Sequence, residues 1–214
     1  ITEEAMAQAQ EQMDTVSPSF LVLADPSWNP GVVGIVASKI VTTFRRPTII
    51  LGGSAENTFK GSGRSIETFH IFEGLSQVSS HLLHFGGHKM AAGLTLEFGQ
   101  LEAFRKAIDI VAKKCLTNDD FISRIMVDYS GSIEEFTVAT IKELEQLAPF
   151  GSGNPRPVIG VENVSLKEVR AIGADSKHLR VVINDSVHSL TCVGFHFGNY
   201  EPHLKNEKYV SLVG

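Results

Sequence analysis

Short apolar strands and amphipathic helices alternate over residues 17–116, and this pattern constrains the fold more than any other feature of the chain. Residues 17–25 and 46–53 are apolar segments typical of buried strands. Between them lie closely spaced valines and isoleucines that predict a helix with a broad apolar surface, for which Asn29 is the expected N-cap. Residues 58–66 predict a further strand that is interrupted by glycines. Strands that alternate with helices predict an α/β domain.

The rest of this segment completes the pattern. Thr68 is expected to cap a helix that runs to about Leu82, and "AAGLTLEF" reads as the next strand. Residues 100–116 predict a strongly amphipathic helix. Residues 1–14 are good helix formers with acidic residues near their start, which predicts a helix that leads out of something upstream.

From residue 117 the pattern changes to short alternating strands with Gly, Asn-Asp and Ala-Asp turns. These strands, interrupted by a helical segment at 138–147, predict a small antiparallel β-barrel. We therefore expect three parts: a connecting helix at 1–16, an α/β domain at 17–116 and a barrel at 117–214. Because the final "KYVSLVG" reads as a strand, we expect the barrel to be truncated at its C-terminal end.

Charge and cysteine content narrow the function classes. The net charge is −5, but residues 17–116 hold ten basic and seven acidic residues, a balance of +3, whereas residues 117–214 hold nine and thirteen, a balance of −4. This asymmetry is weak support for an anionic ligand on the α/β domain. No apolar run approaches the length of a membrane span, and two cysteines far apart, without a CxxC motif, indicate a reducing cytoplasm.

The motif "GSGRS" at residues 61–65 could bind an anion. The guanidinium of Arg64 offers a planar fork for phosphate oxygens, and the hydroxyls of Ser62 and Ser65 add donors. The alternative is a β-bulge with a solvated arginine, since glycine in a strand often marks a bulge.

A second motif, "FGGHKMAAG", begins at Phe85. Gly86 and Gly87 could present successive N–H groups to an oxyanion as a backbone nest, and His88 could donate to the same phosphate. A tight helix-to-strand connection, with His88 in a structural hydrogen bond, explains the same residues equally well.

Three other features are weaker. His81, His84 and His88 suggest a zinc site, but no cysteine or carboxylate lies beside them to complete four ligands. "PFGSGNPRP" at 149–157 predicts a rigid turn cluster. Aromatic residues of the barrel could stack on bases, although such residues more often belong to a core: Tyr129, Phe195, Phe197 and Tyr200.

Four blocks together carry a resemblance to a known family. "WNPGVVGIVASKI", "KGSGRSI", "FGGHKMAAGLTLE" and "LAPFGSGNPRP" occur in the order seen in the RecJ family of single-strand-specific 5′→3′ DNA exonucleases, within the DHH phosphoesterase superfamily. The resemblance covers essentially the whole chain. It implies a DHH-associated domain with a mixed sheet and flanking helices, followed by an oligonucleotide-binding (OB) barrel. The chain thus resembles the C-terminal part of such an enzyme.

The resemblance also implies roles for individual residues. Ser62 and Arg64 would bind the terminal phosphate or the backbone of the substrate, and Gly86, Gly87 and His88 would hold the phosphate near the scissile bond. Further candidate DNA contacts are Ser65, Lys89, Phe195 and Tyr200. The residues that hold Mn²⁺ or Mg²⁺ in the family belong to an upstream DHH domain, whose motifs do not occur in this sequence. We therefore expect no catalytic or metal-binding residues, no bound cofactor and no nuclease activity in this chain alone.

By the same resemblance, the intact protein is a hydrolase that acts in DNA repair and recombination. Its expected partners are single-stranded DNA and a single-strand-binding protein or a helicase, with no membrane. Two other functions stay open: a protein-recruiting or structural module, favoured by the acidic balance of the barrel, and part of a short-oligonucleotide or cyclic-dinucleotide phosphodiesterase.

Overall fold

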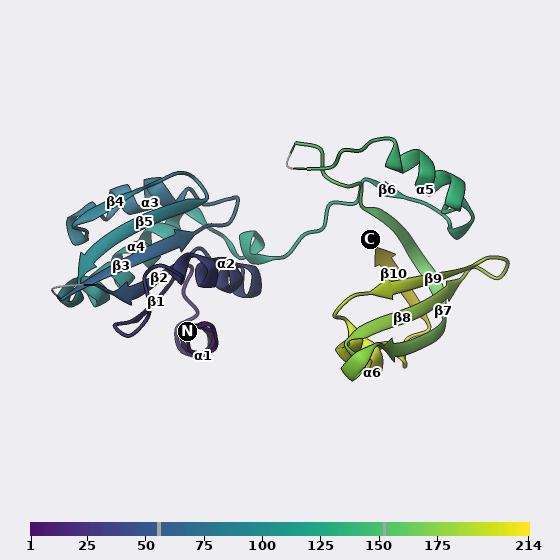
Figure 1. Cartoon of the computed structure of the whole chain (residues 1–214), viewed down its shortest axis with the longest axis horizontal. Coiled ribbons are helices and arrows are strands. Elements are labelled where there is room, and N and C mark those ends of the chain that lie inside the picture. The colour runs from purple at the N-terminus through teal and green to yellow at the C-terminus, as the bar shows by residue number, and fades with distance from the viewer. Residues whose placement is uncertain (55–56, 152) are drawn as a thin grey trace. The chain divides into compact units, whose positions relative to one another are not determined.

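The computed structural model describes residues 1–54, 57–151 and 153–214. The chain forms two compact units, Ile1–Ser123 and Arg124–Gly214 (Figure 1). Each unit is described by itself below. No helix among the described residues is long and apolar enough to cross a membrane.

The first unit is built on one mixed sheet of five strands. The order across the sheet is β1-β2-β3-β5-β4, in which β1 and β2 run parallel and every other pair is antiparallel. The parallel pair is joined by α2, Val33–Phe44, as a strand–helix–strand pattern requires. The strands are β1 Leu21–Asp25, β2 Thr48–Gly53, β3 Thr58–Arg64, β4 His84–Gly87 and β5 Ala91–Glu97. The predicted α/β class is confirmed.

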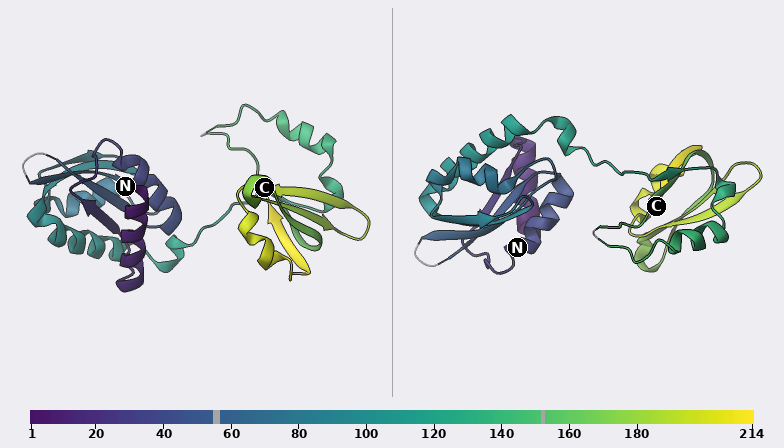
Figure 2. Two further views of the ribbon diagram at one scale, coloured as in Figure 1. Left: turned by 60° about the horizontal axis from the view of Figure 1, so that its bottom comes forward. Right: turned by 90° about the horizontal axis from the view of Figure 1, so that it is seen from above.

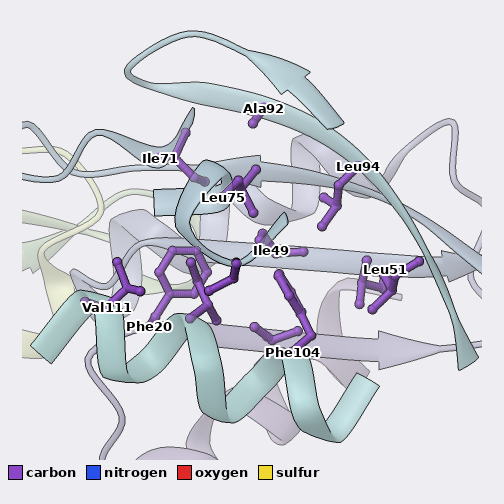
Figure 3. Packing of buried hydrophobic residues seen from close by; sticks show 14 of the residues in the cluster. Phe20, Ile49, Leu51, Ile71, Leu75, Ala92, Leu94, Phe104 and Val111 are labelled. Carbon is purple, nitrogen blue, oxygen red and sulfur yellow. The ribbon is translucent and has the colours of Figure 1, made fainter. Parts of the chain in front are cut away.

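Two helices cover one face of this sheet and form the larger core. They are α3, Ile71–Gln77, and α4, Leu101–Cys115, whose apolar residues are spaced at helical intervals. Side chains from these helices meet those of β2 and β5 in Figure 3, where labelled members include Phe104, Leu75, Ile49 and Leu94. Alternate residues of β3 and β5 point into this core, so the residues between them point to the opposite face.

The opposite face is covered by helices over β1, β2 and the part of β3 that α2 contacts. There α1, Thr2–Thr15, and α2 bury a second apolar cluster that includes Trp28 and Ile50. Figure 2 shows these two helices on one side of the sheet and α4 on the other. Over β3, β5 and β4 the same face carries small and polar residues, which are described in the next subsection.

The free edge of β1 is closed by side chains of α1 rather than by another strand. The Gln8 amide nitrogen donates to the Ala24 carbonyl and its amide oxygen accepts from Ala24 N–H, both at 3.3 Å. Gln12 Nε2 donates to the Val22 carbonyl at 3.1 Å, and Trp28 Nε1 donates to Glu4 Oε2 at 2.7 Å. Helix α1 therefore belongs to the folding unit of the sheet and satisfies backbone groups that an open edge would expose.

Both predicted N-caps in this unit, Asn29 and Thr68, are wrong. Helix α2 begins at Val33 because Asn29 instead accepts a hydrogen bond from Gly31 N–H, which closes a local turn before the helix. Helix α3 begins at Ile71, and the N-cap is His70, whose Nδ1 accepts from Glu73 N–H. It ends at Gln77, well before Leu82.

The first unit continues beyond α4 because two arginines hold the following segment. Arg46 stacks over the Phe121 ring, 3.3 Å from its centroid, and Arg45 Nη2 donates to Ser123 Oγ at 2.7 Å. Partial burial lowers the pKa of Arg46 from its usual value.

The second unit is a curled sheet of short strands. The order β10-β7-β8-β9 is antiparallel throughout, and β6 pairs with β7 in parallel. The elements are β6 Tyr129–Ser130, α5 Val138–Glu145, β7 Ile159–Ile172, β8 His178–Asn184, β9 Ser189–Gly194, α6 Glu201–Leu204 and β10 Tyr209–Val213. Apolar residues of these strands line a cavity of about 570 Å³. A small OB-type sheet after the α/β domain is the predicted fold class, and it is confirmed.

Short 3₁₀ helices fill the connections in both units. They are Ser79–His81, Phe98–Gln100, Asn118–Phe121, Ile133–Glu135, Ala174–Ser176 and Gly198–Tyr200.

Candidate nucleic-acid interface

Most of the predicted site residues of the first unit lie on the face of its sheet that α1 and α2 cover only in part. We call this surface the open face and define it by the alternate residues of three neighbouring strands that point away from the larger core: Lys60, Ser62 and Arg64 of β3, Ala91, Gly93 and Thr95 of β5, and His84 and Gly86 of β4. The middle strand carries only small side chains, and the two outer strands carry the cationic and imidazole groups. The open face is therefore low in the middle and polar on both sides.

Strand pairing arranges these residues in rows across the sheet. Arg64 pairs with Ala91, and Ala91 is joined to the start of the β4–β5 turn by a bond from His88 N–H to its carbonyl at 2.8 Å. In the next row Ser62 pairs with Gly93, and Gly93 pairs with Gly86. The two motifs predicted to bind phosphate, 24 positions apart in the sequence when measured from Ser62 to Gly86, therefore lie side by side.

Arg64 is held on the open face by several contacts. Its Nη1 donates to Ser62 Oγ and to the Gly63 carbonyl, both at 2.8 Å. A Cβ placed on Gly34 of α2 would lie 3.1 Å from Arg64 Nη2 and 3.2 Å from Ser62 Oγ. Among the residues that the structure describes, Arg64 forms no ion pair, so its charge is available to an anion.

The β-bulge alternative for "GSGRS" is wrong. Strand β3 pairs with β2 and β5 in continuous register from Thr58 to Arg64, apart from the Thr58 end, which has no β2 partner. The glycines are explained by packing instead. A Cβ on Gly61 would lie 2.6 Å from the Ile50 carbonyl oxygen, and one on Gly63 would lie 2.6 Å from Ile71 Cδ1.

Gly86 and Gly87 lie in a strand and not in the predicted nest or helix-to-strand connection. Both pair with β5, and successive N–H groups of a strand point in opposite directions, so they cannot converge on one oxyanion. Gly87 has φ +153° and a Cβ there would clash with the Ala91 carbonyl oxygen, so the fold itself requires glycine. At Gly86 a Cβ would meet nothing within 4 Å, so packing gives no reason for this glycine.

The turn that follows β4 is fixed by backbone hydrogen bonds. Ser65 N–H donates to the Met90 carbonyl and Ile71 N–H donates to the Lys89 carbonyl, each at 3.0 Å. The side chains of His88 and Lys89 are exposed. The hydroxyl of Ser65 is buried and donates to the Phe69 carbonyl at 2.7 Å, which gives this residue a structural role in the loop between β3 and α3.

The three histidines of the suggested zinc site belong to three different structural elements. His84 is on β4 and His88 is in the turn, whereas His81 Nδ1 lies 3.1 Å from Gln100 Oε1. In the described part of the chain, no three histidine, cysteine or acidic side chains are placed to share a metal ion.

In the second unit the predicted aromatic contacts are exposed. Phe195 is 68% exposed and its ring lies 5.4 Å from that of His178, while Tyr200 is 48% exposed and lies 5.5 Å from Phe197. Tyr129 has a local role instead. Its hydroxyl donates to the Glu135 carboxylate, and this bond, with those from Ser132, lowers the pKa of Glu135 to about 2.

The cluster at 149–157 is a turn, as predicted. Asn154 Nδ2 donates to the carbonyls of Leu147 and Pro149 at 2.8 and 3.1 Å, and the backbones of Gly151 and Asn154 are bonded to each other. Ser152, within the same motif, lies outside the described residues.

Sequence reasoning did not assign four residues of this surface to the phosphate-binding site. Gly34 approaches Arg64 from a helix, and Lys60, Thr95 and His84 share the open face with the motif residues. Strand alternation places Lys60 on the same side as Ser62 and Arg64, so that signal was present in the sequence. The neighbours across the sheet depend on register.

Comparisons with known proteins cover both units. A model of the DHHA1 domain matches residues 17–114, and a model of the RecJ OB domain matches residues 127–214. The single-stranded-DNA-specific exonuclease RecJ of Bacillus subtilis is 42% identical over 215 aligned residues, which span 100% of this chain and 27% of the relative. RecJ of Escherichia coli is 32% identical over 178 residues, 81% of this chain and 30% of the relative.

Solved structures give the same result. Crystal structures of Thermus thermophilus RecJ in complex with Mn²⁺ and with Mg²⁺ superpose with TM-scores of 0.70 and 0.72 at 26% and 25% identity. They cover 89% and 91% of this chain, and the chain covers 28% and 30% of theirs. The chain thus spans less than a third of the length of these relatives.

Proposed function

Because the chain belongs to the RecJ family, with a DHHA1 domain followed by a RecJ OB domain, we propose that it is the substrate-binding, C-terminal portion of a single-stranded-DNA-specific 5′→3′ exonuclease. One observation supports this most strongly. Arg64 and Ser62, both half-buried, are held together on the open face beside a glycine whose missing side chain leaves open space. An arginine fork with an adjacent hydroxyl suits a phosphate group of DNA.

The open face would bind and orient the substrate. Arg64 and Ser62 would hold the terminal phosphate or a backbone phosphate. His88, with one outward-facing N–H group of the pair Gly86 and Gly87, would hold the phosphate near the scissile bond. As β4 is an edge strand, alternate N–H groups along it face away from β5 and are free to donate. Holding a phosphodiester in this way lowers the entropy cost of the reaction, although this chain forms no covalent bond to the substrate.

The open face does not fit a divalent metal. Mn²⁺ and Mg²⁺ prefer carboxylate oxygens, and this face offers guanidinium, ammonium, imidazole and hydroxyl groups. The relatives from Thermus thermophilus were crystallised with these ions. We therefore assign the metal ligands and the catalytic residues of the intact enzyme to a DHH domain outside this sequence, and we expect this chain alone to be inactive.

The second unit would guide single-stranded DNA mainly by stacking. Phe195 and Tyr200 are exposed and lie beside other rings, an arrangement that suits base stacking. The acidic balance of this part disfavours strong electrostatic attraction of DNA.

The family supports a broader setting for the intact protein. We place it in the cytoplasm, in DNA repair and recombination, where a single-strand-binding protein or a helicase would supply its substrate. Two free cysteines, Cys115 and Cys192, fit a reducing compartment.

Binding measurements test the proposed function. The 214-residue chain should bind 5′-phosphorylated single-stranded DNA in fluorescence titrations, with an affinity that falls steeply as salt rises. It should release no nucleotides when Mn²⁺ is added. Digestion under these conditions would contradict the expected inactivity, whereas the lack of saturable binding at low salt would favour a protein-recruiting module. Equal affinity for dinucleotides and long strands would favour a short-oligonucleotide enzyme.

Gly34→Ala should separate substrate binding from stability. The added methyl group would push Arg64 Nη2 and Ser62 Oγ away by a few tenths of an ångström, and we expect a several-fold loss of affinity for 5′-phosphorylated DNA. Stability should stay equal or rise slightly, because alanine favours a helix over glycine by about 0.5–1 kcal/mol. DNA titration and thermal denaturation of the same variant check both expectations.

Gly99→Ala is the matched control, because a Cβ there meets nothing within 4 Å. In an Arg64→Ala background the Gly34 substitution should have a smaller effect on binding, because only the Ser62 hydroxyl remains to be displaced. A fully additive effect would show that Gly34 acts through something other than its approach to Arg64.

A further inference from the structure

The open face continues past the motif residues to a third row. Lys60 on β3 pairs with Thr95 on β5, and Thr95 pairs with His84 on β4. None of these three residues belongs to the motifs assigned to phosphate binding above. Neighbouring residues on each strand belong to the larger core, including Phe59, Leu94, Leu96 and Phe85, so the side chains of this row point to the open face.

The groups of this row are free to meet a ligand. Lys60 and His84 are exposed and Thr95 is half-buried. Among the described residues, neither Lys60 nor His84 forms an ion pair, and none of the three side chains has a hydrogen-bond partner within the fold. Their ammonium, imidazole and hydroxyl groups are donors that suit a phosphate.

The distance between neighbouring rows suits consecutive phosphates of an extended nucleic-acid strand. Two residues along a β-strand advance about 6.7 Å, so Lys60 lies roughly 13 Å along β3 from Arg64. The row between them, Ser62, Gly93 and Gly86, has little side-chain bulk. A nucleic-acid strand with one phosphate bound to Arg64 could therefore cross this middle row and place a phosphate at Lys60 two nucleotides further along.

The row after Lys60 carries an acidic residue, so the series of phosphate-binding rows ends there. It pairs Thr58 with Glu97, whose carboxylate is exposed. A phosphate placed there would meet a like charge. The favourable part of the open face thus runs from Arg64 to Lys60 and stops.

We propose that Lys60, Thr95 and His84 form a second phosphate subsite, which binds a phosphodiester of the same nucleic-acid strand whose other phosphate lies on Arg64 and Ser62. The subsite rests on the proposed function, because it needs a ligand with several linked phosphates. It extends that function by assigning the open face a length of about three nucleotides.

Binding of two short probes to the whole 214-residue chain tests the subsite. The probes are 5′-phosphorylated thymidine and the 5′-phosphorylated thymidine trinucleotide, each titrated into Lys60→Gln, Arg64→Ala and unchanged protein. Lys60→Gln should weaken binding of the trinucleotide three- to tenfold and leave the mononucleotide unchanged. It should also reduce the salt dependence of trinucleotide binding by about one charge. Arg64→Ala should weaken both probes.

Lys106→Gln is the matched control, since this exposed lysine is on α4, which covers the opposite face of the sheet. It should leave both affinities unchanged. Amide resonances of His84 and Thr95 should shift with the trinucleotide and not with the mononucleotide in NMR titrations.

The outcomes separate the two proposals. If the unchanged chain binds neither probe nor longer single strands, the proposed function fails, and the subsite fails with it. If it binds the trinucleotide but Lys60→Gln has no effect, or weakens both probes equally, the subsite alone is overturned.

Discussion

A chain that begins at Ser17, without α1, should lose on the order of 5 kcal/mol of the unfolding free energy of the first unit. Removing the helix exposes Trp28 and its neighbours in the second apolar cluster, and the Trp28 indole loses its bond to Glu4. The β1 edge also loses its bonds to Gln8 and Gln12. Domains of this size are stable by only 5–15 kcal/mol in total, so the loss is a large fraction.

Calorimetry would measure the loss as a fall of roughly 20 °C or more in the melting temperature of the first unit. The transition of the second unit serves as an internal reference. Gln8→Ala with Gln12→Ala in the full chain isolates the edge contacts and should cost less than the truncation. A truncated chain with an unchanged melting temperature would mean that α1 is dispensable for folding.

Arg64→Ala should weaken binding of 5′-phosphorylated single-stranded DNA about 10- to 100-fold, which corresponds to about 1.5–3 kcal/mol for a hydrogen bond to a charged group. The guanidinium is held by Ser62, Gly63 and the first turn of α2, so its position is fixed before a ligand arrives. Titration of fluorescent DNA at two salt concentrations would show the loss and a shallower salt dependence.

Arg64→Lys is the informative companion because it keeps the charge but removes the planar fork. We expect it to recover only part of the affinity. Thermal denaturation should show that both variants are folded. Affinity equal to that of the unchanged protein in Arg64→Ala would remove this residue from the site.

Local pattern was enough to predict most of the elements. The apolar runs at 17–25 and 46–53 contain β1 and β2, and the amphipathic segment 100–116 contains α4 almost end to end. The N-caps were less well predicted, because the Asn29 side chain closes a turn before α2 and His70 caps α3 in place of Thr68. Strand β4 was read as a connection, since two glycines weaken strand propensity and only pairing with β5 stabilises it.

The candidate site could be predicted in its residue types but not in its geometry. The sequence shows Ser62, Arg64 and the glycine pair, while their alignment in rows follows from register between β3, β5 and β4. The approach of Gly34 to Arg64 joins positions 30 residues apart and leaves no periodic signal. Contacts between residues far apart in the chain depend on how the elements pack, so a single sequence does not predict them.

The small side chains at the centre of the open face determine whether this surface can recognise a DNA sequence. Ala91, Gly93 and Gly86 offer no side-chain donor or acceptor that could distinguish one base from another. Phosphate contacts fix register and orientation but carry no message about sequence. An enzyme that held its substrate on such a surface would cut every sequence alike, and would select its substrates by strandedness and by the chemistry of the strand end.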